Sequence, residues 1–252
     1  REKEREIQRD LEDGIDTKGK KMTLCELYAK KTAQRINVKK NTLAGRKYLM
    51  DALKQDKLGS RSIDSIKPSD AKEWAVRMKE KGYGFKTISN YKRSLKASFE
   101  DDYVRKNPFD FQLSEVIDDD SESRQALSEE QEEKLLSFLQ YDTVYQKYYD
   151  DVLILLKTGL RISELCGLTV QDLDFENHTL NIDHQLLRNQ EGYYIETPKT
   201  KCGIRKVPMS EEAGKAFQRV LKRKKTGKGI VIDGYRNFLF LNQKGMPMTA
   251  CY

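Results

Sequence analysis

The sequence is poor in the residue types that most often hold structural metals or cross-links. It contains four cysteines and two histidines in 252 residues, and the cysteines lie far apart with no Cys-x-x-Cys pair. Disulfide frameworks and structural zinc sites need short, regular spacings of these residues. We therefore expect neither, and interpret the cysteines as reduced thiols of a cytoplasmic protein. They are Cys25, Cys166, Cys202 and Cys251, and the histidines are His178 and His184.

Long apolar runs and nucleotide-binding motifs are also missing. No segment approaches the apolar run of about 18 residues that spans a membrane, and the N-terminal segment is charged, unlike a signal peptide. The sequence has no Gly-x-x-x-x-Gly-Lys phosphate loop, no Gly-x-Gly-x-x-Gly turn after a strand and no His-Glu-x-x-His zinc motif. We predict a protein that needs no metal or nucleotide cofactor and has no membrane partner.

The excess of positive charge is modest. The chain has 47 Lys and Arg against 40 Asp and Glu, for a net charge of +7. An excess of this size does not by itself indicate a nucleic-acid partner, whereas clustering of the basic residues would.

Composition divides the chain into four parts. Residues 1–21 alternate in charge and predict an N-terminal linker helix, and residues 22–112 predict a compact helical domain. Residues 113–126 predict a polar interdomain linker, and residues 127–252 a second, mixed domain. The linker includes three consecutive carboxylates, Asp118 to Asp120, which raises a metal-dependent nuclease as a rival. Neighbouring carboxylates in a flexible run are seldom a preformed site, so we favour the linker.

Two basic clusters stand out in the helical domain. A helix predicted from Lys86 to Phe99 has an outward face without any acid before Glu100, whereas ordinary surface helices mix both signs. Such a face is a candidate for phosphate contact, with solvated lysines as the alternative. The second cluster surrounds another helix start. The candidate DNA-contacting residues are Lys39, Lys40, Asn41, Arg46, Lys86, Thr87, Asn90, Arg93 and Lys96.

The second domain opens with two helix signals and one break. Ser128 and Gln131 have capping-box spacing, as do Thr23 and Glu26 in the first domain. The apolar stretch 151–157 predicts a buried helix, which Gly159 ends. Arg161 follows directly. A guanidinium anchored there could grip a phosphate through two parallel hydrogen bonds, or it could form an ion pair with Glu164 or Asp172.

The periodicity then changes from helical to extended. Residues 179–183, 192–196 and 204–208 predict three short strands in an antiparallel meander, with residues 197–203 at the tip between the second and third. A helix over 211–224 follows, and 237–241 is a further apolar run. The tip contains two lysines, so a second cation lies on a projecting loop.

Several of these motifs together resemble the tyrosine recombinases of the phage lambda integrase type, and within them the integrases of conjugative transposons. The resemblance covers nearly the whole chain and lies in the segments 91–99, 107–109, 127–130, 158–165, 198–201 and 205–208. It implies an α+β fold in which a helical core-binding (SAM-like) domain precedes a mostly helical catalytic domain. A small three-stranded antiparallel sheet belongs to the latter, and the two domains form a clamp around DNA.

The resemblance also implies roles for individual residues. Arg161 corresponds to the first of two arginines that hold the scissile phosphate, and Glu164 to the supporting acid of the same motif. Lys199 corresponds to the lysine that protonates the departing 5′ oxygen, a step that an ammonium can perform and a guanidinium cannot. Lys201 is its competitor, and we prefer Lys199 because it follows the second strand more closely. Lys201 and Arg205 are further candidates for DNA contact.

The second half of the family's active site has no counterpart here. No His-x-x-Arg motif is present, and nothing before Tyr252 marks it as the nucleophile. We therefore expect these groups to lie beyond the sequence given, and expect further residues to be absent near Phe99 and Glu100.

We predict a site-specific DNA recombinase of a bacterial mobile element that cuts and rejoins strands through a covalent 3′-phosphotyrosine link. Its implied partners are double-stranded DNA, as element ends and target sites, and three further copies of itself in a homo-tetramer on DNA. Its implied location is the cytoplasm, associated with the nucleoid. The alternative is a non-catalytic DNA-binding relative that keeps the clamp and lacks the nucleophile.

Overall fold

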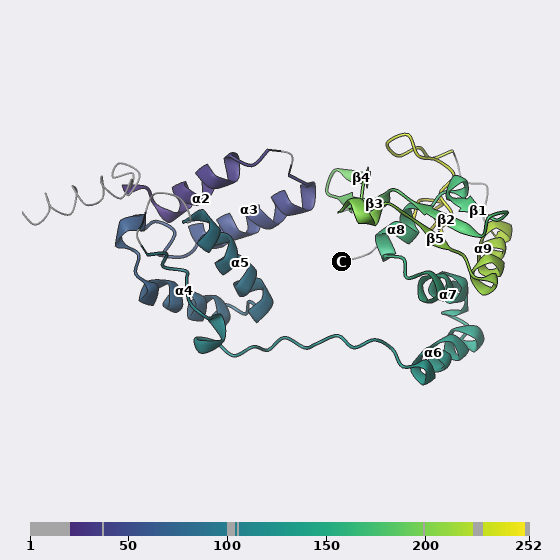
Figure 1. Cartoon of the computed structure of the whole chain (residues 1–252), viewed down its shortest axis with the longest axis horizontal. Helices are drawn as coiled ribbons and strands as arrows, with labels where there is room; N and C mark the ends of the chain where they lie inside the picture. Colours follow the sequence, from purple (N-terminus) through teal and green to yellow (C-terminus); the bar gives the residue numbers. More distant parts are fainter. Residues whose placement is uncertain are drawn as a thin grey trace, which may run out of the picture. The chain divides into compact units, whose positions relative to one another are not determined.

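The computed structural model describes residues 21–36, 38–99, 104, 106–198, 200–223 and 229–249, without the side chain of Lys201. The linker helix predicted within residues 1–21 therefore lies outside the described residues, except for Lys21. The chain divides after Arg124 into two compact units (Figure 1). Each unit has its own hydrophobic core and is described by itself.

The first unit is helical. Its elements are α2 (Leu24–Ala33), α3 (Lys40–Lys54), η2 (Ile63–Ser65), α4 (Pro68–Glu80), α5 (Phe85–Ser98) and η3 (Leu113–Glu115). The predicted capping box at the first helix is confirmed: Thr23 Oγ1 accepts from the Glu26 N–H at 3.2 Å, and Glu26 Oε2 accepts from the Thr23 N–H at 2.8 Å. These bonds satisfy two of the N–H groups that a helix start leaves without partners.

The core of this unit is built around Trp74 on α4, which is fully buried. The ring of Phe109 meets it edge-on, with ring centroids 5.8 Å apart, and Phe99 lies against Phe109 at 5.7 Å. Asn107 anchors this return of the chain, because its side-chain amide donates to the carbonyl of Lys96 at 2.8 Å, near the end of α5. Residues 107–109 thus close the helical unit over its core.

The boundary of this unit differs from the predicted linker, residues 113–126. Leu113 and Ile117 are buried in the first core, and Asp120 accepts a hydrogen bond from the N–H of Phe85 at 3.0 Å. The apolar side chains of residues 113–126 are too sparse to show helical or strand periodicity. Composition alone therefore made this segment look like a linker.

The second unit combines helices and short strands. Its elements are α6 (Glu129–Tyr141), η4 (Gln146–Tyr148), α7 (Tyr149–Thr158), α8 (Ile162–Gly167), η5 (Val170–Asp172), β1 (Leu173–Asp174), β2 (Thr179–Ile182), β3 (Gln185–Asn189), β4 (Gly192–Glu196), η6 (Lys201–Gly203), β5 (Arg205–Pro208) and α9 (Glu211–Arg223). The predicted capping box of Ser128 and Gln131 starts α6. α7 packs against α9, and the side chains of Leu153, Ile154 and Phe217 meet in the second core.

The strands form two small antiparallel sheets rather than one meander. One sheet has the order β1-β2-β5, with Leu180 opposite Val207, and the other is the hairpin β3-β4, with Leu187 opposite Tyr194. The predicted meander is therefore wrong in its pairing, although the three-stranded antiparallel sheet and the α+β class are both present. The segment 197–204 connects the two sheets, so it is not the tip of a hairpin.

β3 escaped prediction because Arg188 and Asn189 interrupt its apolar pattern. A two-residue turn between Asn189 and Gly192 closes the hairpin, and Gly192 has a φ of 130°. Among the described helices, none combines the length and apolarity needed to cross a membrane.

Candidate functional site

Arg161 lies at a rigid break between two helices. α7 ends at Gly159, whose φ of 62° is left-handed, and Arg161 is the extended residue at which α8 begins. Leu160 between them is buried, which anchors the break to the core. The Arg161 side chain remains 67% exposed, so its guanidinium is fixed at its base and accessible at its tip.

Glu164 is the partner of Arg161. Its carboxylate, which is 2% exposed, accepts from the Arg161 N–H at 2.9 Å and from Arg161 Nη1 at 2.7 Å. The other candidate, Asp172, instead accepts from Thr169. Burial disfavours the charged form of Glu164, but hydrogen bonds from Arg205 and from Arg161 outweigh it and lower the pKa of Glu164.

Arg205 also binds Glu164. Its Nη2 lies 2.9 Å from Glu164 Oε2, its Nη1 lies 3.1 Å from Oε1, and Nη1 also donates to the carbonyl of Gly203 at 3.0 Å. The Arg205 side chain is 28% exposed. Sequence position alone suggested DNA contact for Arg205, and it could not reveal that the side chain has these protein acceptors.

The two lysines of the connecting segment cannot be compared with Arg161 directly. Lys199 lies outside the described residues, and of Lys201 only the backbone is described, as the first residue of η6. The neighbours are described: Pro198 is buried and Thr200 is exposed. The preference for Lys199 over Lys201 therefore stays a prediction.

The basic residues of the first domain lie on two helices. Lys86, Thr87, Asn90, Arg93 and Lys96 all lie on α5, and Arg93 is exposed. Other segments supply partners to these lysines: Lys96 Nζ pairs with the carboxylate of Asp110 at 2.6 Å, and Lys86 Nζ donates to the backbone carbonyl of Glu122 at 3.3 Å. The face is thus less uniformly positive than its own sequence indicated.

The other cluster surrounds the first turns of α3. Lys39 is the residue before the helix, Lys40 and Asn41 are its first two residues, and Arg46 lies one turn further on. The first turn of α3 contains no acid. One guanidinium nitrogen of Arg46, Nη1, is buried and has no hydrogen-bond partner among the described residues.

Two carboxylates of the acidic run have protein partners. Asp120 pairs with Lys79 and with the start of α5, and Asp119 accepts from Ser121. Among the described residues, the ligand atoms that gather within 4.8 Å belong instead to Asp172, Asp183 and His184.

His184 lies between β2 and β3 and bonds to the end of α8. Its Nε2 lies 2.8 Å from the carbonyl of Gly167 at the end of α8, its Nδ1 bonds to Asp183, and its ring stacks on Tyr235. Because both ring nitrogens already have protein partners, we interpret this group as a structural support. Sequence spacing could not indicate it, since Asp172 and His184 belong to different elements.

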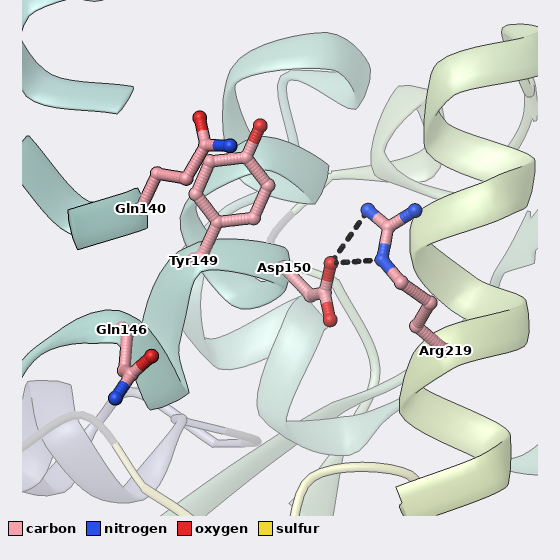
Figure 2. Close-up of a pocket in the computed structure, with 5 residues that line it drawn as sticks. All are labelled: Gln140, Gln146, Tyr149, Asp150 and Arg219. Carbon is pink, nitrogen blue, oxygen red and sulfur yellow. Dashed lines mark hydrogen bonds and ion pairs between the residues drawn. The ribbon is translucent and has the colours of Figure 1, made fainter. Parts of the chain in front are cut away.

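A cavity of about 420 Å³ lies elsewhere in the second unit (Figure 2). Asp150 and Arg219 both line it and are bonded directly to each other, with Arg219 Nε 2.8 Å from Asp150 Oδ1. Asp150 is in the first turn of α7 and Gly159 ends that helix, roughly 13 Å away along its axis at 1.5 Å per residue. The cavity is therefore separate from the Arg161 site. The residues lining it are Gln140, Gln146, Tyr149, Asp150 and Arg219.

The site thus combines an arginine at a helix break, a buried acid that supports it, and a small antiparallel sheet. This combination is the one expected of a tyrosine recombinase. The chain belongs to the phage integrase family, whose model matches residues 125–251. The predicted membership in the tyrosine recombinases is confirmed.

Individual relatives come from transposons and from a phage. The transposase from transposon Tn916 of Enterococcus faecalis is 67% identical over 255 residues, which cover 99% of this chain and 63% of that protein. This chain thus spans less than two thirds of that relative's length.

Solved structures of integrases are also similar to this chain. The Tn1549 transposon integrase in complex with a circular intermediate DNA is 62% identical with a TM-score of 0.87, covering 91% of this chain and 74% of that chain. A lambda integrase tetramer bound to a Holliday junction is 14% identical with a TM-score of 0.57, covering 90% and 60%, and shows the shared fold alone.

Proposed function

We propose that this chain is part of a mobile-element integrase that cuts and rejoins DNA through a covalent 3′-phosphotyrosine link. The tyrosine oxygen attacks the scissile phosphorus, the bond to the 5′ oxygen breaks, and that oxygen takes up a proton. The new phosphodiester keeps the energy of the old one, so neither a nucleotide nor a metal is required. The observation that carries this proposal is the exposed guanidinium of Arg161, fixed at a helix break above a buried acid.

Arg161 would hold the non-bridging oxygens of the phosphate and stabilise the charge that develops in the transition state. Glu164 occupies the inner side of this guanidinium, through Nη1, while two thirds of the side chain surface stays accessible. A planar fork with five donors can serve a carboxylate and a phosphate at once.

Lys199 would donate the proton to the 5′ oxygen. Its segment is attached on one side to β4 and on the other, through Gly203 and Arg205, to Glu164. This attachment supports a place for the lysine near Arg161, with Lys201 as the competitor for the same role.

The substrate would be double-stranded DNA, namely the ends of the element and its target sites. The complexes of the Tn1549 integrase with circular intermediate DNA support this choice. The basic faces of α5 and α3 would contact the backbone, so that the two units form a clamp on the duplex in the bacterial cytoplasm, at the nucleoid. The resemblance to the tyrosine recombinases also implies a homo-tetramer on two duplexes, which is part of the proposal.

The test is the covalent adduct formed by the full-length protein on a nicked suicide substrate, assayed with and without EDTA. We expect adducts in both conditions, their loss in Arg161→Ala, and DNA binding by that variant close to the parent's. Wild-type adduct levels in Arg161→Ala would contradict the role of Arg161. Absence of any adduct or cleavage with the parent protein would favour the non-catalytic relative, and cleavage without an adduct that EDTA abolishes would favour a metal-dependent nuclease.

A further inference from the structure

We propose that Arg205 and Gln185 are positioning residues that hold the two described ends of the lysine loop against the helical turn that carries Arg161. The lysine loop is the segment 197–204, and its described residues are 197, 198 and 200–204. This inference rests on the proposed function, because it concerns how the proton donor of that reaction is placed. It assigns Arg205 to the interior of the site rather than to DNA contact.

The base of the lysine loop is closed by a close approach of its two ends. A Cβ added to Gly203 would lie 2.4 Å from the Cβ of Pro198, a distance at which one of them must move. The Gly203 N–H also donates to the carbonyl of Thr200 at 2.8 Å. Glycine is therefore required at position 203, and the loop leaves and returns at nearly one point.

The C-terminal end of the lysine loop, at Gly203, is bonded to α8 through Arg205. One guanidinium joins the carbonyl of Gly203 at 3.0 Å to both oxygens of Glu164 at 3.1 and 2.9 Å. The same Glu164 Oε1 accepts from Arg161 Nη1 at 2.7 Å. Only two side chains thus separate the loop from the guanidinium that would hold the phosphate.

The N-terminal end of the lysine loop, at Thr197, has a second connection to α8. This connection runs through Ser163, one residue before Glu164. Ser163 Oγ donates to Gln185 Oε1 at 3.0 Å, and Gln185 Nε2 donates to the carbonyl of Thr197 at 3.4 Å. Gln185 is the first residue of β3 and pairs with Glu196 at the end of β4. α8 also packs closely on β3, since a Cβ at Gly167 would lie 2.9 Å from the Leu186 nitrogen.

Arg161, Ser163 and Glu164 therefore set one local frame, and both ends of the lysine loop are attached to it. A shift of about 1 Å in a reacting group can cost on the order of 100-fold in rate. Loss of Arg205 would displace the loop while Arg161 keeps its backbone and its own bonds to Glu164. The defect should then fall on proton donation rather than on phosphate binding.

A DNA substrate with sulfur in place of the scissile 5′ oxygen separates these two effects, because a thiolate leaves without being protonated. The test is single-turnover cleavage by the full-length protein of two substrates. One has the natural 5′ oxygen at the scissile bond (the oxygen substrate), and the other has sulfur there (the sulfur substrate). We expect Arg205→Gln to cleave the oxygen substrate about 100-fold more slowly and the sulfur substrate near the parent rate. Arg205→Lys should recover little, since one ammonium cannot bridge both carboxylate oxygens and a carbonyl. Lys206→Gln, an exposed neighbour on β5, is the control and should match the parent on both substrates.

Two further variants decide the matter if Arg205→Gln does not fold. Gly203→Ala opens the base of the loop, and Gln185→Leu removes the second connection, both without changing charge. Each should show the same selective loss on the oxygen substrate. An equal loss on both substrates, or a loss of DNA affinity without a change in cleavage rate, would overturn the inference.

The same assay distinguishes failure of the inference from failure of the proposed function. Rescue of Lys199→Ala or Lys201→Ala by sulfur, without rescue of the positioning variants, overturns the inference and leaves the function standing. If neither lysine variant is rescued although adducts form, the lysine role and the inference both fail. Loss of adducts from every protein, the parent included, overturns the proposed function itself.

Discussion

Arg161 and Arg205 donate to the same carboxylate oxygen, Glu164 Oε1, at 2.7 and 3.1 Å. Their exposure differs, since the side chain of Arg161 is 67% exposed and that of Arg205 is 28% exposed. A buried carboxylate without partners would be costly, and two cations outweigh that cost here. The pair is thus asymmetric: the guanidinium of Arg205 supports the acid from within the fold, and that of Arg161 stays largely accessible.

The first prediction concerns stability and pH. Burial opposes the charged form of Glu164, yet its hydrogen bonds, that from Arg205 foremost, bring its pKa below the ordinary range. Such a group contributes stability that is present above the unfolded pKa of about 4.3 and is lost as the pH falls through the lower folded pKa. Arg205→Gln should lower the free energy of unfolding by about 1.5–3 kcal/mol at pH 7, and by less near pH 4, where the variant's carboxyl protonates.

Urea unfolding at both pH values measures this difference. Lys206→Gln on the same strand serves as the control and should show no such pH dependence. An equal loss at both pH values would mean that Arg205 acts through packing and not through the charge of Glu164.

The second prediction compares one substitution at two glycines. A Cβ would meet nothing within 4 Å at either Gly159 or Gly45. Gly159 ends α7 with a φ of 62°, whereas Gly45 lies inside α3. Gly159→Ala should cost about 1–2 kcal/mol because alanine is strained in the left-handed region, and Gly45→Ala should stabilise by about 0.5–1 kcal/mol. Thermal unfolding of both variants checks the opposite signs, and a stabilised Gly159→Ala would contradict the left-handed cap.

Local signals in the sequence were sufficient for the helix starts and for the break at the site. Ser128 and Gln131 form their capping box as spaced, and the apolar run 151–157 becomes a partly buried helix that ends at Gly159. These features depend on residues three or four positions apart, where backbone geometry alone brings the groups together.

Contacts between distant segments could not be predicted in this way. Glu164 and Arg205 are 41 positions apart, and Lys96 and Asp110 are 14 positions apart. A single sequence shows the charge of each group but not its partner, so Arg205 and Lys96 looked equally available for DNA. The pairing of β2 with β5 across an intervening hairpin has the same cause.

The third prediction separates two cations on α5. Arg93 is exposed, and the one polar contact described for its guanidinium is with Asn90 at 3.5 Å, whereas Lys96 pairs with Asp110 at 2.6 Å. If α5 contacts DNA, Arg93→Gln should reduce the slope of log affinity against log salt by about 0.9. Lys96→Gln should reduce it less, because Asp110 already offsets its charge. Binding isotherms at several salt concentrations test this, and equal slopes for Arg93→Gln and the parent would show that this part of α5 does not contact the backbone.

The last prediction concerns Asp120, which occupies the start of α5. Its Oδ1 accepts from the Phe85 N–H at 3.0 Å and its Oδ2 pairs with Lys79, so a carboxylate holds two donors that would otherwise favour a phosphate. Asp120→Asn should destabilise the chain slightly, through the weakened helix start. It should also raise DNA affinity and steepen the salt dependence, as Lys79 becomes available. Asp118→Asn, an equal charge change at an exposed neighbouring position, is the matched control. If both variants bind DNA alike, the effect comes from net charge, and Asp120 does not compete with the DNA backbone for α5.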